Sequence, residues 1–234
     1  ILAKAGYFRQ EYDGAQDYDF ILRCTEEAKH IVHIPKVLYH WRCHPQSTSE
    51  NPESKLYAFT NGCKAVKAHY DRIGIPAEVE RGPFYGMYHT KYQWKEEPLL
   101  SIIIPNKDHV DDLKKCIESV ENRSVYRNFE FVIVENNSIE EETFAYYKEL
   151  EKRDNVTVLY YKGKFNYSRI NNFGVAQAKG EYILLLNNDT EMIEPESIKE
   201  MLDVCMRPDV GIVGAKLLYC LLYTSPSPRD STSS

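Results

Sequence analysis

Three polar clusters in the second half of the chain each follow directly after a run of apolar residues. Their sequences are Asn-Lys-Asp at 106–108, Glu-Asn-Asn-Ser at 135–138 and Asn-Asn-Asp at 187–189. Carboxylate and amide oxygens accept hydrogen bonds from a base edge or ribose hydroxyls, and they suit Mg²⁺ or Mn²⁺, which can bridge a diphosphate. Any one cluster is equally well explained as a turn, because Asn and Asp favour turns at strand ends. Three such clusters together favour a ligand site.

The elements that must position these clusters alternate between strand and helix. Short apolar runs predict strands at 99–104, 129–134, 156–160, 182–186 and 210–213. Apolar residues at helical spacing predict helices at 110–120, 140–152, 170–179 and 198–206. Pro105 is expected to end the first strand, and Gly180 to end the third helix. This alternation predicts an α/β fold with a mostly parallel sheet, whose carboxyl edge gathers the strand ends and binds ligands.

The first part of the chain follows a different pattern. Residues 18–27 predict an amphipathic helix, residues 30–34 a short strand, and residues 55–70 a second helix with one apolar face. Residues 74–97 are aromatic and punctuated by Gly and Pro, which predicts a linker packed on its neighbours.

Composition excludes several classes of protein. The 234 residues are 43% hydrophobic and 27% charged, with a net charge of -6, which is typical of a soluble globular protein and gives no indication of nucleic-acid binding. No apolar run approaches the roughly 20 residues that a membrane-spanning helix needs. Six irregularly spaced cysteines predict reduced thiols in a cytoplasmic protein rather than disulfides or a zinc site.

Two common nucleotide-binding motifs are absent from the sequence. No G-x-G-x-x-G follows Pro105, which disfavours a nicotinamide dinucleotide site, and there is no P-loop. A receiver-like regulatory module is also disfavoured, because the third predicted strand is followed by Tyr-Lys-Gly-Lys rather than by a phospho-accepting Asp.

Four segments share an order and a spacing that point to one family. They are SIIIPNKD at 101–108, FVIVENNS at 131–138, FNYSRINNFG at 165–174 and GEYILLLNNDTE at 180–191. Together they resemble the inverting family 2 glycosyltransferases of the GT-A fold, and they cover nearly all of residues 99–219. The resemblance implies a GT-A fold built from partial domains.

The resemblance also implies roles for individual residues. The implied donor-nucleotide residues are Pro105, Asn106, Asp108, Glu135, Asn137, Arg169, Asn172 and Asn187. Glu135 would accept a hydrogen bond from the base, where the family usually has Asp. Asp189 would hold Mg²⁺ or Mn²⁺ at the position of the family's D-x-D motif, with Asn187 replacing the first Asp. Arg169 and Asn172 are equally well explained as a solvated helix start.

Two segments upstream resemble the other end of the same kind of domain. GAQDYDFILR at 14–23 resembles the acceptor-side motif, with Asp17 as the catalytic base and Gln16 where Glu is usual. YHWRCHPQSTS at 39–49 resembles the loop that closes over the donor, where Arg42 or His44 would contact the diphosphate. Without the resemblance, Asp17 would be interpreted as a solvated charge at a helix start.

The order of these parts is the reverse of that in a single transferase domain. We therefore expect the C-terminal part of a first glycosyltransferase domain at 1–54, a helical and linker segment at 55–97, and the nucleotide-binding half of a second domain at 98–219. Residues 220–234 are rich in Ser and Pro, resemble a translated sequencing adapter, and are expected to be a non-native tail. Such tandem enzymes resemble those that build bacterial capsule or O-antigen, so this chain is interpreted as an inactive fragment of one.

The implied activity is sugar transfer from a nucleotide-diphospho-sugar to a glycan or a lipid-linked glycan. The sugar would be a hexose or deoxyhexose, the mechanism inverting and metal-dependent, and the location cytoplasmic or peripheral at the inner face of the membrane. The alternative is a non-catalytic, transferase-like module that binds nucleotides or serves as a scaffold. The departures at Asn187 and Glu135 keep this alternative open.

Overall fold

The computed structural model describes residues 1–40 and 56–218. It divides into two compact units, Ile1–Trp94 (unit 1) and Lys95–Ser234 (unit 2), and each is described by itself. Within the described residues, no helix is both long enough and apolar enough to cross a membrane. Arg42, His44 and the tail at 220–234 lie outside the described residues, so the predictions made for them have no structural counterpart.

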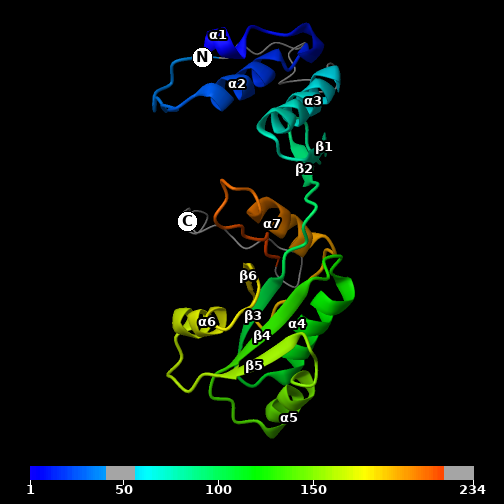
Figure 1. Cartoon of the computed structure of the whole chain (residues 1–234), viewed down its shortest axis with the longest axis vertical. Helices are drawn as coiled ribbons and strands as arrows, with labels where there is room; N and C mark the ends of the chain where they lie inside the picture. The colour runs from blue at the N-terminus through cyan, green and yellow to red at the C-terminus, as the bar shows by residue number, and fades with distance from the viewer. Residues whose placement is uncertain (41–55, 219–234) are drawn as a thin grey trace, which may run out of the picture. The chain divides into compact units, whose positions relative to one another are not determined.

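Unit 1 is built from helices and one antiparallel hairpin (Figure 1). Its elements are α1 (Leu2–Ala5), the 3₁₀ helix η1 (Gln10–Tyr12), α2 (Gln16–Glu27), α3 (Leu56–Ile73), β1 (Ala77–Arg81) and β2 (Tyr88–Tyr92). Helix α3 packs against both α2 and β1. Glu26 on α2 accepts hydrogen bonds from Arg72 and His69 on α3, so the two helices are joined by charge as well as by apolar contact.

Unit 2 contains a four-stranded, fully parallel sheet. Its elements are β3 (Leu100–Asn106), α4 (Val110–Arg123), β4 (Phe129–Glu135), α5 (Glu141–Leu150), β5 (Val156–Tyr160), α6 (Tyr167–Val175), β6 (Tyr182–Leu185) and α7 (Ser197–Cys205). The strand order is β5-β4-β3-β6, which places β3 and β4 in the centre. The predicted α/β class with a parallel sheet is therefore confirmed.

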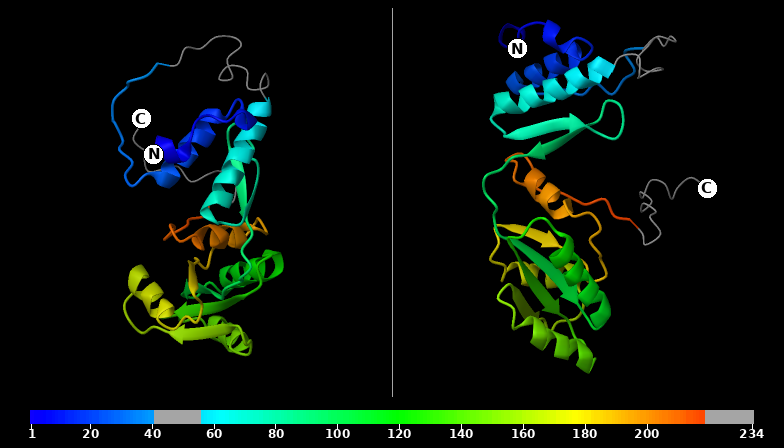
Figure 2. Two further views of the ribbon diagram at one scale, coloured as in Figure 1. Left: turned by 45° about the horizontal axis from the view of Figure 1, so that its top comes forward. Right: turned by 90° about the vertical axis from the view of Figure 1, so that its right-hand side faces the viewer.

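Alternate residues of the central strands supply two cores on opposite faces of the sheet. Ile102 and Phe131 join a large cluster with α4, α5 and α7, whereas Ile103 and Val134 pack against α6. Figures 1 and 2 show α6 on one face and α4 with α5 on the other. Gly174 lets α6 approach closely, because a Cβ there would lie 2.6 Å from Ile103 Cγ2. Both strands read as continuous apolar runs because both of their faces are buried.

Strand β3 does not stop before Pro105, as the sequence suggested, but continues through it to Asn106. Proline has no backbone N–H to donate, and a residue in a central strand normally donates its N–H to one of the two neighbouring strands. Here β6 ends at Leu185, which pairs with Ile103, so the neighbour on that side has already ended when the chain reaches Pro105. Pro105 still pairs in register with Val134 on the other side.

Four further predictions of secondary structure were wrong. Residues 30–34 and 210–213 form no strand, because an isolated β-prone run gains little without a partner to pair with. Residues 74–97 contain the β1–β2 hairpin, where only a linker was predicted. Helix α6 begins earlier than predicted, since Asn166 caps it by accepting from Arg169 N at 3.0 Å, and it ends at Val175 rather than at Gly180.

Candidate functional site

The carboxyl edge of the unit 2 sheet brings the three polar clusters together. The backbone N–H of Asn136 donates to the carbonyl of Asn106 at 2.9 Å, and that of Asp108 donates to Oγ of Ser138 at 2.8 Å. Nδ2 of Asn188 donates to Oδ1 of Asn106 at 2.7 Å. The convergence that was predicted from strand order is therefore present in the structure.

Asp108 holds the loop that leads into α5. Its Oδ1 accepts the backbone N–H groups of Ile139 at 2.8 Å and Glu140 at 3.0 Å. Burial alone would raise the pKa of this carboxyl group, but the two hydrogen bonds outweigh that effect and lower the pKa. Asp108 and His109 both adopt left-handed backbone conformations, with φ of 53° and 51°. Such strain at successive non-glycine residues is uncommon and tends to occur at functional sites.

Glu135 ends β4 with its carboxylate buried; the residue is 4% exposed. Oε1 accepts the backbone N–H of Ser138 at 2.6 Å, while Oε2 accepts the hydroxyls of Ser138 and of Tyr147, the latter at 2.8 Å. All of these donors are neutral. Each oxygen of Glu135 already accepts a hydrogen bond from the protein, so a base could share this acceptor only at its remaining lone pairs.

The loop after β6 carries Asn187, Asn188 and Asp189, and α4 anchors it from below. The Cys116 thiol donates to the carbonyl of Asn187 at 3.5 Å, and Ser119 Oγ accepts from the backbone N–H of Met192 at 2.9 Å. One turn further along α4, Arg123 forms an ion pair with Glu191 at 2.8 Å. Burial, and secondly the charge of Asp189, raise the pKa of the Cys116 thiol to about 12.

Asp189 presents an exposed carboxylate at this edge. Among the described residues, no hydrogen bond or ion pair engages its side chain, and no group of three or more His, Cys, Asp or Glu side chains is arranged to hold a metal ion by itself. Asn187 is also exposed, and its Oδ1 accepts from the Tyr167 hydroxyl at 3.3 Å. One carboxylate with a neighbouring amide oxygen fits Mg²⁺ or Mn²⁺, which commonly takes its other ligands from substrate phosphates and water.

Asn137 and α6 complete the carboxyl edge. Asn137 has a φ of 60° and donates from Nδ2 to the carbonyl of Gly163 at 2.9 Å, which ties the loop after β4 to the loop after β5. Arg169 and Asn172 are exposed and lie three residues apart, so they share one side of α6. Their side chains are free to contact a ligand, whereas Pro105 lies half-buried within β3.

Asp17 lies in unit 1, in the first turn of α2, with its side chain exposed. Its Oδ1 accepts the backbone N–H of Tyr18 at 2.9 Å. The residue borders a hollow of about 400 Å³, lined also by Tyr18, Ala58 and Tyr88. Two positions along the helix, Asp19 is completely buried and binds Arg9 and Arg23. The carboxylate proposed to react and the carboxylate that anchors the helix are thus different residues.

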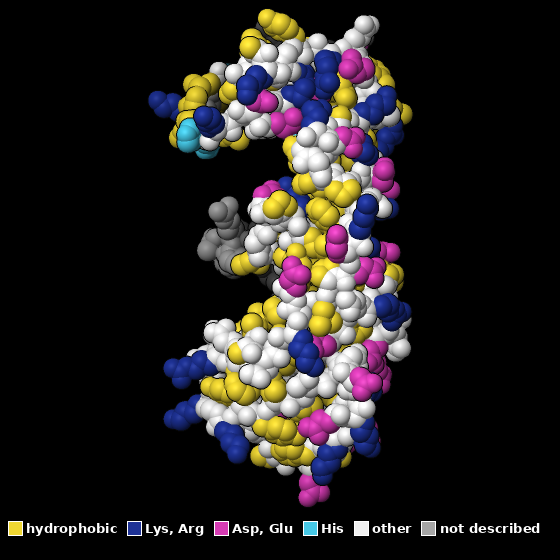
Figure 3. All heavy atoms as spheres, in the orientation of Figure 1, with side chains coloured by type: hydrophobic (Ala, Val, Ile, Leu, Met, Phe, Trp, Pro, Cys, Tyr) yellow, Lys and Arg dark blue, Asp and Glu magenta, His cyan; other side chains and the backbone are white. Residues whose placement is uncertain are grey.

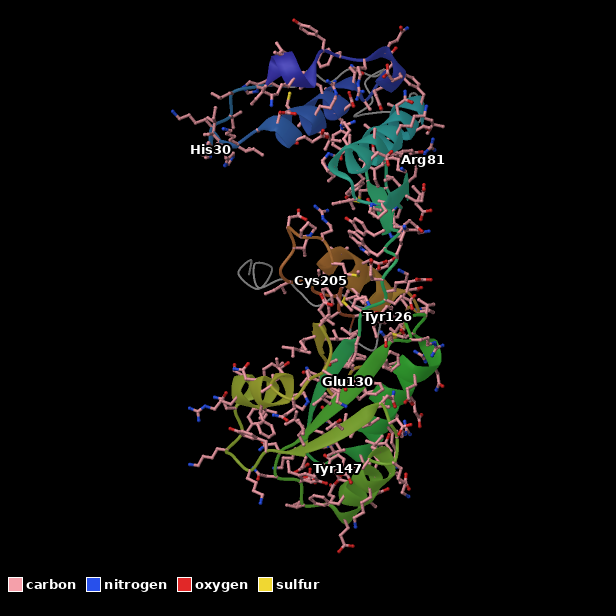
Figure 4. All side chains as sticks on the ribbon, viewed as in Figure 1. His30, Arg81, Tyr126, Glu130, Tyr147 and Cys205 are labelled. Atoms are coloured by element: carbon pink, nitrogen blue, oxygen red, sulfur yellow. The ribbon has the colours of Figure 1, made fainter. Side chains whose placement is uncertain are left out.

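Several residues at the carboxyl edge were not predicted as site residues. Tyr147 falls within the helix predicted at 140–152, and it lies buried between α5 and the sheet (Figure 4). Its hydroxyl nevertheless bridges Glu135 and Asn106, which spacing alone does not reveal. Asn188 and Ser138 belong to the predicted clusters, and the only available signal was their position between predicted site residues.

Comparison with known proteins gives one family match and two long alignments. The pattern of Glycosyl transferase family 2 matches residues 101–232. The protein y4gI of Sinorhizobium fredii (strain NBRC 101917 / NGR234) is 41% identical over 223 residues, which are 94% of this chain and 24% of that protein. The O-antigen biosynthesis protein RfbC of Myxococcus xanthus is 37% identical over 219 residues, which are 93% of this chain and 17% of that protein.

The chain therefore spans about a quarter or less of the length of these curated relatives. Among solved structures, the mannosyltransferase PcManGT from Pyrobaculum calidifontis, in complex with GDP-Man and Mn²⁺, aligns with a TM-score of 0.45 at 16% identity. That alignment covers 68% of this chain and 45% of the other.

Proposed function

The chain belongs to glycosyl transferase family 2, and from this premise we propose that unit 2 binds a nucleotide-diphospho-sugar at the carboxyl edge of its sheet. The observation that carries the proposal is the convergence of three polar clusters beside the exposed, unengaged carboxylate of Asp189. Asp189 would hold Mg²⁺ or Mn²⁺ there. Arg169 and Asn172, on the free side of α6, would contact the nucleotide.

The proposed reaction is an inverting sugar transfer in the whole protein. Asp17, exposed beside its hollow in unit 1, is proposed as the base that accepts the proton of an acceptor hydroxyl in a first transferase domain. A divalent cation held by Asp189 would supply charge stabilisation for the nucleoside diphosphate leaving group. Unit 2 would then be the donor half of a second domain, within the expected boundaries 98–219.

The acceptor is proposed to be a bacterial surface glycan, free or lipid-linked. The relative from Myxococcus xanthus is described as an O-antigen biosynthesis protein, and it aligns with 93% of this chain. Such an acceptor would place the protein in the cytoplasm or at the inner face of the membrane.

One specific observation favours a second candidate, a transferase-like module without catalytic activity. Glu135 is proposed to accept a hydrogen bond from the base, yet its carboxylate already accepts hydrogen bonds from Ser138 and Tyr147. In addition, Asn187 replaces a carboxylate with a weaker metal ligand. A scaffold of this kind would retain the fold and lack metal-dependent nucleotide binding.

Calorimetric titration of the full chain separates the two candidates. UDP, GDP and dTDP are each added with and without Mn²⁺, to wild type and to Asp189→Ala. The donor-site proposal expects saturable binding of one nucleotide that requires Mn²⁺ and is lost in Asp189→Ala. Asp154→Ala is the matched control, because Asp154 is also exposed but precedes β5 at the opposite end of the sheet. A folded wild type that binds none of the three nucleotides would contradict the proposal and favour the scaffold.

A further inference from the structure

A continuous chain of side-chain hydrogen bonds crosses the carboxyl edge from one polar cluster to another. It runs from Glu135 to the hydroxyl of Tyr147 at 2.8 Å, from that hydroxyl to Nδ2 of Asn106 at 2.7 Å, and from Oδ1 of Asn106 to Nδ2 of Asn188 at 2.7 Å. The first three residues are buried and Asn188 is half-buried. The chain therefore joins the end of β4 to the loop after β6, with a side chain of α5 as its bridge.

The direction of every hydrogen bond in this chain follows from the charge at its first member. An ionised carboxylate only accepts, so the Tyr147 hydroxyl must donate its one proton to Glu135 and accept from Asn106. The amide of Asn106 therefore turns its Nδ2 toward Tyr147 and the Asp108 carbonyl, and its Oδ1 toward Asn188. Asn188 in turn must present Nδ2. The Tyr147 hydroxyl and the Asp108 carbonyl thus together set the orientation of the Asn106 amide, and Asn106 in turn sets that of Asn188.

Asn188 is the inward-facing residue of a loop whose two neighbours are exposed. Asn187 and Asp189 flank it, and both present their side chains to solvent. Holding Asn188 against Asn106 therefore fixes the side of the loop from which Asp189 projects. The anchors from α4, Cys116 and Ser119, act on the backbone at Asn187 and Met192 and do not engage Asn188.

We propose that Tyr147 is a positioning residue that aligns the Asp189 loop with the Glu135 end of the site through Asn106 and Asn188. The proposal rests on the donor-site function proposed above for this edge. It follows that cation and nucleotide bind unit 2 cooperatively, because both ends of the site share one hydrogen-bonded chain. Tyr147 itself touches neither ligand.

The test compares Tyr147→Phe with Tyr146→Phe in the full chain. Tyr146 is the neighbouring buried tyrosine on α5, and it lies outside the hydrogen-bonded chain. The nucleotide that wild type binds is titrated calorimetrically with and without Mn²⁺, and the ratio of the two dissociation constants measures cooperativity. Tyr147→Phe should reduce that ratio at least about five-fold, the lower end of ordinary coupling between sites. Tyr146→Phe should leave it unchanged.

A purely structural role for Tyr147 would leave the ratio unchanged. In that case both dissociation constants would shift together with the folded fraction, which a urea unfolding curve of each variant measures separately. An unchanged ratio in folded Tyr147→Phe would overturn the proposal.

A second readout decides the proposal without any nucleotide. In a ¹H–¹⁵N correlation spectrum, the side-chain amide signals of Asn106 and Asn188 should both shift in Tyr147→Phe and stay in place in Tyr146→Phe. An Asn188 signal that does not move would overturn the positioning role. If folded wild type binds no nucleotide, the donor-site function fails, and this spectrum alone decides whether Tyr147 positions the loop.

Discussion

Asp19 in unit 1 and Glu135 in unit 2 are both buried carboxylates, and they are stabilised in opposite ways. In unit 1, Asp19 accepts hydrogen bonds from two arginines, with Arg23 Nη2 at 2.8 Å and Arg9 Nε at 3.2 Å. In unit 2, Glu135 is surrounded by the neutral donors of Ser138 and Tyr147. Both groups are almost completely removed from water.

The difference in donors distinguishes Asp19, which anchors structure, from Glu135, which is proposed to take part in binding. The arginines at Asp19 cancel its charge and extend the link outward, because Arg23 also donates to the carbonyls of Ala5 and Tyr7. That arrangement fixes the first residues of the chain on α2. Glu135 has only neutral donors, with no arginine or lysine bonded to it, at the edge where a cation is proposed to bind. Figure 3 shows hydrophobic side chains among charged ones at the surface of both units.

The largest expected effect comes from removing the charge of the anchor. Asp19→Asn leaves Arg23 buried without its counter-ion, and breaking a buried pair in this way typically costs about 3–5 kcal/mol. Trp94 stacks on Tyr92 in unit 1, and unit 2 contains no tryptophan, so tryptophan fluorescence during urea unfolding reports on unit 1. A loss well below 1 kcal/mol would show that the pair is not a structural anchor.

The free energy of unfolding of unit 1 should also fall in acid because of Asp19, and by no more than Asp19→Asn costs. Burial alone would raise the pKa of Asp19, but hydrogen bonds and charge from Arg9 and Arg23 lower it below its usual range. A lowered folded pKa contributes stability that is fully present above the unfolded value of about 3.9 and is lost as pH falls through the folded pKa. The free energy of unfolding measured by fluorescence should therefore fall below about pH 4 in wild type. A plot of unfolding free energy against pH should be less steep for Asp19→Asn than for wild type. Equal steepness would refute the claim that Asp19 causes the loss of stability in acid.

A smaller loss of stability is expected when a hydrogen-bond donor to Glu135 is removed in unit 2. Tyr147→Phe removes one donor from Glu135 and one acceptor from Asn106, a change that typically costs about 1–2 kcal/mol. Hydrogen exchange of the backbone amides in β3 and β4 measures the stability of this unit, which contains no tryptophan. Tyr146→Phe is again the control, and equal losses in the two variants would mean that losing any buried tyrosine hydroxyl, rather than the hydrogen bonds of Tyr147, sets the cost.

The smallest expected effect is at Asp17, which differs from Asp19 by two positions on the same helix. Its side chain is exposed and accepts only from the next backbone N–H, so Asp17→Asn should change the unfolding free energy by less than about 0.5 kcal/mol. Fluorescence-detected urea unfolding measures it beside Asp19→Asn. A large loss at Asp17 would remove the distinction between a reactive and an anchoring carboxylate on α2.

The parallel sheet and the meeting of its polar clusters were predictable from sequence, because buried parallel strands read as apolar runs and their carboxyl ends share one edge. Which carboxylate is engaged was not predictable. Asp108, Glu135 and Asp189 look alike in sequence, yet only Asp189 is both exposed and unengaged among the described parts of this edge. That distinction depends on three-dimensional partners such as Tyr147.

The β1–β2 hairpin was missed for a related reason. Its strands, AEVER and YHTKY, are only five residues long and carry few strongly apolar side chains, so the alternation that marks a half-buried strand gives a weak signal. The pairing is supported instead by charges across the two strands, where Glu80 meets Lys91 at 2.8 Å and His89 at 3.1 Å. Such complementarity becomes visible only once the register is known.

The buried thiol of Cys116, beneath the Asp189 loop, can report how often this loop opens. Cys116 is fully covered and its pKa is raised to about 12, so at neutral pH it is almost entirely protonated and reacts slowly with thiol reagents. Modification requires the loop above it to lift. In a variant whose only cysteine is Cys116, the rate of thiol labelling would therefore measure how often the loop opens. A ligand that holds the loop closed would slow that rate in proportion to its occupancy.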